Sequence, residues 1–189
     1  MGVGLEWYLL VEDPWRVVMS TDHPNGGSFL AYPQIIRLLM DRTYRREALK
    51  KCPEKIYERS TLRDLDREYT LNEIAIITRA GPARILGLKN KGHLGPGADA
   101  DITIYTPHEN KETMFELPRV VIKSGRVMIE NGEIRDPFIG KTLHVAPAYD
   151  TEVESDIQAW FEQYYSIRWR NYPVDDSYLH ESEIVPSQG

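Results

Sequence analysis

The sequence predicts a mixed α/β fold, and three observations support that prediction. An amphipathic helix at residues 4–12 is followed, after a very short connection, by an apolar strand at residues 16–20, which is the order of a parallel α/β unit. Helices with recognisable start and stop signals are expected to fill residues 33–87. Residues 88–147 contain short apolar runs separated by glycine turns, which predicts a small β-region.

The strand at residues 16–20 is expected to be buried. Val17, Val18 and Met19 are consecutive apolar residues, the pattern of a parallel strand that is covered on both faces. A parallel strand needs a neighbouring strand, and the rest of the chain offers no second clear βαβ unit. We therefore expect the sequence to be the tail of a larger protein.

The helical region begins with a helix expected from Pro33 to about Lys51. Proline is favourable in the first helical turn, and Pro53 ends the apolar pattern. The charged residues 54–69 contain at most a short helical turn around Leu62 and Leu65.

Two further helices are expected before the β-region. Thr70 and Glu73 form a predicted capping box, in which each side chain satisfies a free backbone N–H at the helix start. Gly81-Pro82 is expected to break this helix, and a second short helix then ends at a left-handed Gly87.

Strands of the β-region are expected at residues 102–105, 120–122 and 127–129, with a last one at 142–145. Ser124-Gly125 and Asn131-Gly132 are the predicted hairpin turns between them.

Beyond the β-region, a Thr151–Glu154 capping box predicts a final helix. The polar, acidic end from Asn171 is expected to be a docking arm or a disordered tail. The sequence thus divides into predicted parts at 1–87, 88–147 and 148–189.

Composition excludes several classes of protein. The chain has 189 residues, 41% hydrophobic and 28% charged, which are globular values. A net charge of −6 disfavours a general binder of nucleic acid or anionic membranes. The basic run Arg42–Arg46 with Lys50-Lys51 is predicted to be a solvated helix face.

Compartment signals favour the cytoplasm. Cys52 is the only cysteine and can form no internal disulfide, which is simplest in a reducing compartment. The first 15 residues have no basic region before their apolar residues and carry Glu6, Glu12 and Asp13, so they are not expected to be a signal peptide. No apolar run approaches the roughly 18 residues that span a bilayer.

Asp22 is the first candidate for chemistry, because it stands at the end of the predicted buried strand, where barrel enzymes place reactive residues. A capped turn explains Asp22, His23 and Asn25 equally well, since Asp and Asn accept backbone N–H bonds in turns. Gly26 and Gly27 are too few to predict a phosphate loop, but they let the backbone approach a ligand.

A complete metal site is not expected from this chain. None of the five histidines has the close spacing of a zinc pair; they are His23, His93, His108, His144 and His180. One metal ligand is a separate possibility, and Asp22 is the candidate. Asp99 and Asp101 follow a Gly-Pro-Gly turn directly, so a turn and strand-start role is favoured for them over a cation site.

Residues 77–88 and 91–102 together resemble the C-terminal signature of the metal-dependent amidohydrolase superfamily. In that superfamily the signature leaves a (β/α)8 barrel and enters a small β-sandwich, and the hairpin at residues 120–127 is similar to the one that follows. The resemblance implies a C-terminal remnant of a metal-dependent hydrolase barrel, then a β-sandwich portion and a C-terminal helix.

The loop Ser20–Gly27 and its lead-in with Trp15 resemble a narrower family. They are similar to the A subunits of formylmethanofuran dehydrogenases and of related bacterial formyltransferase/hydrolase complexes. The resemblance covers residues 4–147 and implies an enzyme of one-carbon metabolism, including methanogenesis.

The family implies a hydrolytic mechanism with two zinc ions. They are held by a His-X-His pair, a modified lysine, two further histidines and an aspartate that matches Asp22. That aspartate would contact one metal, take a proton from water and pass it to the leaving amine. The substrate implied is the N-formyl group of a methanofuran-type amine, with formate formed or consumed, and with His23, Asn25, Gly26 and Gly27 around it.

The other metal ligands of the family have no counterpart in this sequence. We therefore expect the chain to be inactive alone and to need other subunits of such a complex, or a missing N-terminal part. Apolar surface exposed by the lost barrel should also favour oligomers. The alternative is a non-catalytic structural or assembly module, in which Asp22 is only a turn residue.

Overall fold

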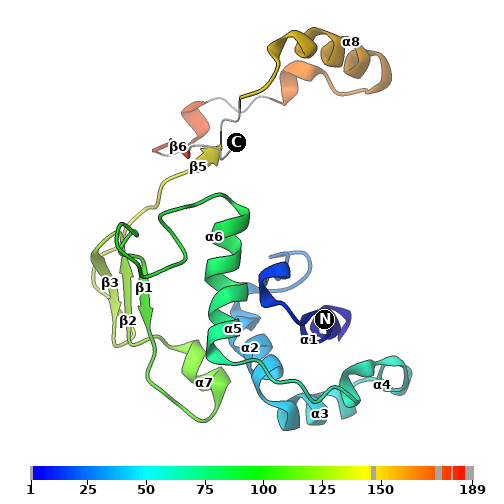
Figure 1. Ribbon diagram of the computed structural model, residues 1–189, viewed down its shortest axis with the longest axis vertical. Helices are drawn as coiled ribbons and strands as arrows, with labels where there is room; N and C mark the ends of the chain where they lie inside the picture. Colours follow the sequence, from blue (N-terminus) through cyan, green and yellow to red (C-terminus); the bar gives the residue numbers. More distant parts are fainter. Residues whose placement is uncertain (1, 146–147, 173–175, 180, 186–189) are drawn as a thin grey trace. The chain divides into compact units, whose positions relative to one another are not determined.

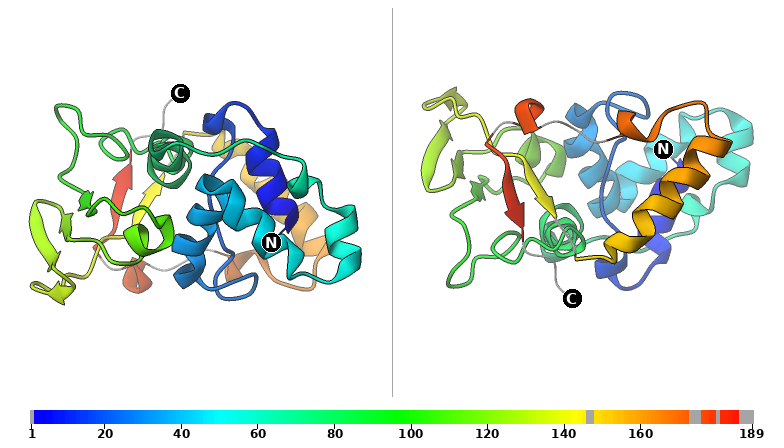
Figure 2. Two further views of the ribbon diagram at one scale, coloured as in Figure 1. Left: turned by 90° about the horizontal axis from the view of Figure 1, so that it is seen from below. Right: turned by 90° about the horizontal axis from the view of Figure 1, so that it is seen from above.

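The computed structural model describes residues 2–145, 148–172, 176–179 and 181–185. The chain forms two compact units, Met1–Pro137 and Phe138–Gly189 (Figures 1 and 2), and each is described by itself. Helices fill the described chain up to residue 85 and most of the strands follow them, so the predicted mixture of helices and strands is confirmed. The division at residues 87 and 147 stays a prediction. Within the described ranges, no helix is long and apolar enough to cross a membrane.

The first unit is mainly helical up to residue 85. Its α-helices are α1 Gly2–Leu10, α2 Tyr32–Met40, α3 Arg42–Lys50, α4 Glu54–Arg59, α5 Leu71–Ala75, α6 Gly81–Ile85 and α7 Lys111–Glu116. Short turns of other helix types are η1 Pro14–Arg16, η2 Phe29–Ala31, η3 Thr61–Arg63 and the π-turn η4 Ile76–Ala80.

The core of this unit lies between α1, α2, α3, η3 and the α5–η4 segment (Figure 1). Its most deeply buried apolar side chains are Leu39, Ile74 and Ile77, which are at most 1% exposed. The core also includes Leu5, Leu9, Met19, Ile35, Ile36, Leu38, Leu49, Leu62 and Tyr69. Burial of these side chains, at about 1.5–3 kcal/mol each, supplies most of the drive to fold.

The single helix predicted over residues 33–51 is wrong, because the chain breaks at Asp41. Its backbone is extended (φ −130°, ψ 95°), and its carboxylate accepts a hydrogen bond from the Tyr44 N–H at 2.8 Å. Asp41 therefore ends α2 and caps α3, a role that aspartate fills well. The break turns a second apolar face, centred on Leu49, toward the core.

The basic run at residues 42–46 is not wholly a solvated face. Arg45 is 1% exposed and donates hydrogen bonds to the carbonyls of Leu38, Leu65 and Arg67. Burial lowers the pKa of its guanidinium group. Because α3 is rotated by the break at Asp41, this one arginine points inward and joins α2 to the segment before α5.

The capping box at Thr70 and Glu73 is confirmed, since both reciprocal hydrogen bonds are present. The predicted break at Gly81-Pro82 is wrong. Gly81 is helical (φ −62°, ψ −53°), and its N–H donates to the carbonyl of Ile76, five residues back. This π-turn accommodates Pro82, so α5, η4 and α6 form one continuous helix (Figure 1).

Gly87 ends α6 in the left-handed conformation (φ 71°), as predicted. The Gly87 N–H donates to Arg84 and the Leu88 N–H donates to Ala83, at 3.1 and 2.8 Å. This is the hydrogen-bond pattern of a Schellman motif, which satisfies the last free carbonyls of a helix.

A four-stranded antiparallel sheet completes the first unit. Its strands, in spatial order, are β1 Ile102–Ile104, β2 Val120–Lys123, β3 Arg126–Glu130 and β4 Glu133–Ile134. Ser124-Gly125 and Asn131-Gly132 have positive φ at both positions, so both predicted hairpin turns are confirmed. The helix α7 between β1 and β2 is absent from the sequence prediction; Asn110 caps it.

Residues 16–20 do not form the predicted strand. Val17 is extended, but the only backbone bond from this segment to a distant part of the described chain is from the Met19 N–H to the carbonyl of Ile77, at 2.9 Å. No described strand lies beside the segment, so no ladder forms. Met19 is nevertheless buried, as expected.

The second unit contains α8 Glu154–Tyr164, the short turns η5 Thr151–Val153, η6 Trp169–Asn171 and η7 Asp176–Tyr178, and two strands. The strand at 142–145 does not extend the four-stranded sheet as predicted. Instead β5 Leu143–Val145 pairs in parallel with β6 Glu183–Val185. Part of the predicted docking arm or disordered tail is thus a strand.

The predicted capping box at Thr151 and Glu154 is wrong. Asp150 is the residue that caps this region, and it accepts a hydrogen bond from the Glu152 N–H. The 3-10 turn η5 precedes α8, so the residue that caps the helical segment is Asp150, one position before Thr151.

Candidate functional site

The predicted site lies in an exposed loop between η1 and η2. Asp22 has a left-handed backbone (φ 50°), which aspartate tolerates better than most residues. Its carbonyl accepts a hydrogen bond from the Gly26 N–H at 2.7 Å, and its own N–H donates to Ser20 Oγ at 3.3 Å. The loop is therefore closed on itself by Asp22 at one end and Gly26 at the other.

Gly26 lies directly against the Asp22 side chain. A Cβ added at Gly26 would lie 2.9 Å from Asp22 Cβ and 3.1 Å from Asp22 Oδ2. The added Cβ would also lie 3.0 Å from the Thr21 carbonyl, so only glycine leaves room for this loop and for the Asp22 side chain. At Gly27 an added Cβ would meet only the Thr21 carbonyl, at an ordinary 3.6 Å.

His23 and Asn25 are exposed beside Asp22. The imidazole of His23 packs edge-on against Phe29, with ring centroids 4.7 Å apart, and the His23–Pro24 peptide bond is cis. The structure thus joins Asp22 to Gly26 directly, whereas His23 contacts Phe29 instead. The loop leaves a carboxylate, an imidazole and an amide exposed to solvent.

The described residues do not make a metal site on their own. Across the ranges that the structure covers, no three His, Cys, Asp or Glu side chains come together in a way that could hold an ion. His180 lies outside the described residues. Asp22 offers one carboxylate, whereas a zinc site needs at least three protein ligands, so the donor set does not fit a complete zinc centre.

Asp99 and Asp101 are engaged by ammonium groups. Lys91 Nζ lies 2.6 Å from Asp99 and 2.8 Å from Asp101, and Lys123 Nζ lies 2.5 Å from Asp101. The Ser124 N–H also donates to Asp101. This network joins the loop after α6 to the β2–β3 hairpin, which is the structural role favoured by the sequence.

The electrostatics of this network follow from two opposing effects. Burial raises the pKa of Asp101, but hydrogen bonds from Lys123 and Lys91 outweigh it, so the pKa lies well below its ordinary value. Burial lowers the pKa of Lys91, and hydrogen bonds to Asp101 and Asp99 raise it by more. These groups are therefore charged at neutral pH and are not suited to proton transfer.

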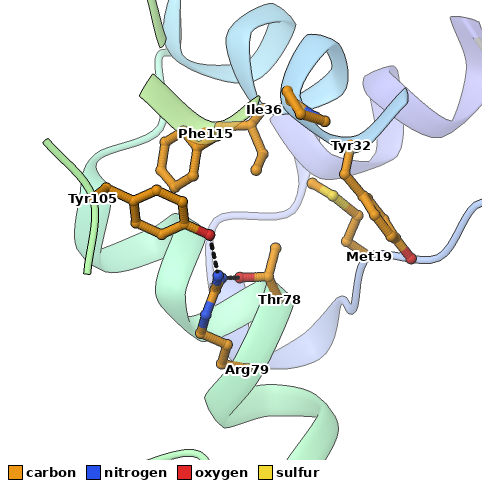
Figure 3. A pocket seen from close by; sticks show the side chains of 8 residues that line it. Met19, Tyr32, Ile36, Thr78, Arg79, Tyr105 and Phe115 are labelled. Carbon is orange, nitrogen blue, oxygen red and sulfur yellow. Dashed lines mark hydrogen bonds between the residues drawn. The ribbon is translucent and has the colours of Figure 1, made fainter. Parts of the chain in front are cut away.

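A cavity of about 370 Å³ lies within the first unit, and its Met19 wall is three residues before Asp22 in the chain. Figure 3 shows that its walls are mostly apolar and aromatic, with one cationic group. The lining residues are Met19, Tyr32, Pro33, Ile36, Thr78, Arg79, Tyr105 and Phe115. Arg79 donates to Thr78 Oγ1 at 2.5 Å and to the Tyr105 hydroxyl at 2.9 Å.

Nothing in the residue order indicated this cavity. Its lining comes from separate stretches of the chain, and only packing brings them together. Gly26 is predicted from the sequence to let the backbone approach a ligand, but its contact with Asp22 depends on the loop conformation and could not be read from the residue order.

Comparison with known proteins gives a consistent picture. A model of the amidohydrolase family matches residues 5–129. One subunit of the formyltransferase/hydrolase complex Fhc of Methylorubrum extorquens is 39% identical over 181 residues, which are 96% of this chain and 33% of the relative. Protein FwdA of Methanocaldococcus jannaschii is 40% identical over an alignment of 196 residues, gaps included, and this alignment covers 97% of this chain and 34% of the relative.

A solved structure is similar over the whole chain. It is the crystal structure of the formyltransferase/hydrolase complex FhcABCD from Methylorubrum extorquens in complex with methylofuran. The superposition has a TM-score of 0.83 with 38% identity, and it covers 100% of this chain and 35% of the matched chain. The chain therefore spans about a third of the length of the relatives that it matches.

Proposed function

The chain belongs to the amidohydrolase family, and we propose that it supplies the Asp22 carboxylate to the active site of an enzyme subunit of the formyltransferase/hydrolase type. The observation that carries the proposal is the loop itself. An exposed carboxylate stands in a left-handed turn and is seated against a glycine that no larger residue could replace without moving it.

Asp22 is proposed to act in acid–base catalysis. It takes a proton from the water that attacks the formyl carbon, and it returns this proton to the amine nitrogen as the C–N bond breaks. The products are formate and the free amine, and the reverse sequence condenses them. General acid–base groups of this kind typically contribute a factor of about 10²–10⁴ to a rate.

A metal ion, for which we propose zinc, would lower the pKa of water at such a site. The described residues contribute Asp22 as one ligand, so the remaining ligands must come from elsewhere in the assembled protein. The residues of this chain that would surround the formyl group are His23, Asn25, Gly26 and Gly27. Of these, His23 and Asn25 carry groups that can hydrogen-bond to a carbonyl oxygen.

The proposed substrate is an N-formylated amine of the methanofuran type. Two relatives at 39–40% identity and a structural neighbour solved with methylofuran support this choice of substrate. The proposed partners are the remainder of the catalytic subunit, together with the other subunits of such a complex.

The test uses the assembled complex, purified through an affinity tag on the protein that contains this chain. We expect Asp22→Asn to lower formate release from a formylated furan amine by about 10²–10⁴-fold. Asp64→Asn is the matched control, because Asp64 is also exposed and pairs only with its neighbour Arg63 among the described ion pairs. Metal content, measured by mass spectrometry, gives a second readout for Asp22 as a ligand.

The opposite result is equally informative. Unchanged formate release and unchanged metal content in the Asp22→Asn complex would contradict a catalytic role. The chain would then be a non-catalytic assembly module, with Asp22 as a turn residue.

A further inference from the structure

The second unit has no core of its own among its described residues. No described side chain between residues 138 and 185 is buried. Large apolar side chains nevertheless gather on and after α8, and large exposed apolar patches usually mark interaction sites. We define the aromatic patch as Ile157, Trp160, Tyr164 and Tyr165, which are 44%, 53%, 63% and 53% exposed.

The aromatic patch sits on an ordered local structure. The chain after α8 folds back beside the helix (Figure 1). Phe161 packs against three aromatic rings from that segment. Tyr165 stacks on it at 4.6 Å, while Trp169 and Tyr172 meet it edge-on at 5.7 and 5.2 Å.

Glu162 also holds the segment after α8 against the helix. It pairs with Arg168 at 2.9 Å and accepts a hydrogen bond from the Trp169 N–H at 2.9 Å. The exposed rings of the patch are therefore presented by a defined scaffold, which lowers the entropy cost of binding.

The net charge of the second unit indicates which kind of surface it can bind. Residues 138–189 contain nine Asp and Glu but only three Lys and Arg, so the second unit carries the entire net charge of −6 of the chain. A second copy would bring the same negative charge to the interface, and like charges oppose association. A basic surface on a different protein is complementary to this unit.

We propose that the aromatic patch docks on a different protein subunit, in an apolar groove with Lys and Arg around its rim. Trp and Tyr are the residue types that most often dominate binding energy at such interfaces. The proposal deepens the assembly part of the proposed function. It does not depend on any catalytic role of Asp22.

The direct test is photo-crosslinking in the assembled complex, with the full chain in its native organism. A benzophenone amino acid at position 160 or 164 should crosslink to a different subunit of the complex, through a peptide next to Lys or Arg. The same probe at Tyr178, which is 83% exposed in the same unit, is the control site. A crosslink to residues 1–137 of the same chain, to the remainder of the same subunit, to a second copy, or to no protein at all would overturn the proposal.

A second measurement tests the energetics. The double variant Trp160→Ser, Tyr164→Ser should lower recovery of the partner subunit by at least about 10-fold, whereas Tyr178→Ser should not change it. Raising the salt concentration should weaken the wild-type association, because screening removes the charge attraction. Recovery that is unaffected by both the double variant and salt would also overturn the proposal.

The two proposals fail independently. If the patch docks but Asp22 is not catalytic, Asp22→Asn complexes assemble normally and keep their activity. If Asp22 is catalytic but the patch does not dock, the double variant leaves both the composition of the complex and formate release unchanged.

Discussion

Tyr69 donates a hydrogen bond of 2.5 Å from its hydroxyl to the backbone carbonyl of Tyr8. The side-chain hydroxyl of Tyr8 donates a hydrogen bond to the carbonyl of Val18, at 2.7 Å. These two bonds join the segment before α5, the helix α1 and the extended lead-in to the Asp22 loop. Tyr69 is only 2% exposed, so its hydroxyl has no ready substitute partner in water.

Replacing Tyr69 by phenylalanine is expected to destabilise the first unit. The substitution keeps the ring but leaves the Tyr8 carbonyl without its donor, and an unsatisfied buried group costs about 1–3 kcal/mol. The free energy of unfolding, from urea denaturation at pH 7, should fall by this amount. Tyr178→Phe, at an exposed position, should change it little.

Alkaline pH offers a second prediction for the same residue. Burial raises the pKa of Tyr69 to about 12 from an ordinary value of 10. The unfolded chain therefore loses this proton first, and the stability that Tyr69 contributes is present below pH 10 and is lost as the pH rises to about 12. Tyr69→Phe should flatten the decline of stability over that range. An identical slope in the variant would contradict this prediction.

Gly92 is expected to tolerate no side chain. It has a positive φ (79°), and an added Cβ would lie 2.7 Å from Ala83 Cβ and 3.0 Å from the Arg79 carbonyl. Gly92→Ala combines left-handed strain with overpacking, so we expect a loss of about 2–4 kcal/mol in the free energy of unfolding.

Gly97 is the matched control for Gly92. Its φ is also positive (83°), but an added Cβ would meet nothing within 4 Å. Gly97→Ala should therefore cost only the conformational term, about 1–2 kcal/mol. Equal losses in the two variants, measured by urea denaturation, would show that the contact with α6 does not matter.

Asp101 is expected to be the most important carboxylate of the Lys91 network. Asp101→Asn removes charge-assisted bonds to both Lys91 and Lys123. A loss of about 1–3 kcal/mol in the free energy of unfolding is expected at neutral pH. Asp99→Asn removes a single ion pair, with Lys91, and this pair is more exposed than those of Asp101. The substitution should lower the free energy of unfolding by at most about 1 kcal/mol.

The pH dependence of stability shows whether Asp101 stabilises the fold through its charge or through its packing. Its pKa in the folded chain lies below the ordinary 3.8, so its stabilisation is present above pH 3.8 and is lost as the pH falls below that value. The difference between wild type and Asp101→Asn should accordingly shrink in acid. A difference that stays constant down to about pH 2 would mean that the substitution acts through packing alone.

The sequence predicted those features that depend on neighbouring residues. The capping box at Thr70, the left-handed Gly87 and the two hairpin turns each follow from local backbone chemistry, and all are present. Features decided by packing could not be predicted in this way. Asp41 can cap a helix, but it lies inside an apolar helical pattern that predicts a continuous helix, so the break was not predicted. Arg45 lies inside a basic run, and no neighbouring residue indicated that it is buried.

The candidate site shows the same division. Asp22 and its loop could be singled out from residue types, because a carboxylate after an apolar run is a recognisable signal. The segment expected to position it as a strand has no partner strand in the described chain, so its backbone follows other contacts, such as the bond from Met19 to Ile77. The cavity beside Met19 is lined by residues from stretches far apart in the chain, so no sequence pattern predicted it.

The contact between Gly26 and Asp22 gives a sharper test of the site than removal of the carboxylate. A Cβ at Gly26 would lie 2.9 Å from Asp22 Cβ and 3.0 Å from the Thr21 carbonyl, so Gly26→Ala must displace Asp22 while keeping its charge. If Asp22 must be positioned to act on the formyl group, formate release by the assembled complex should fall at least about 10²-fold, since small misplacements of catalytic groups have effects of this size.

Gly4→Ala is the control for Gly26→Ala, because an added Cβ there meets nothing within 4 Å and the residue lies in α1, apart from the proposed site. Both variants should assemble with their partners to the same extent. Full activity of the Gly26→Ala complex would mean that the position of Asp22 is not critical. It would therefore weigh against general-base catalysis even if Asp22→Asn proved inactive, since a residue that must transfer a proton has to be held within hydrogen-bond reach of it.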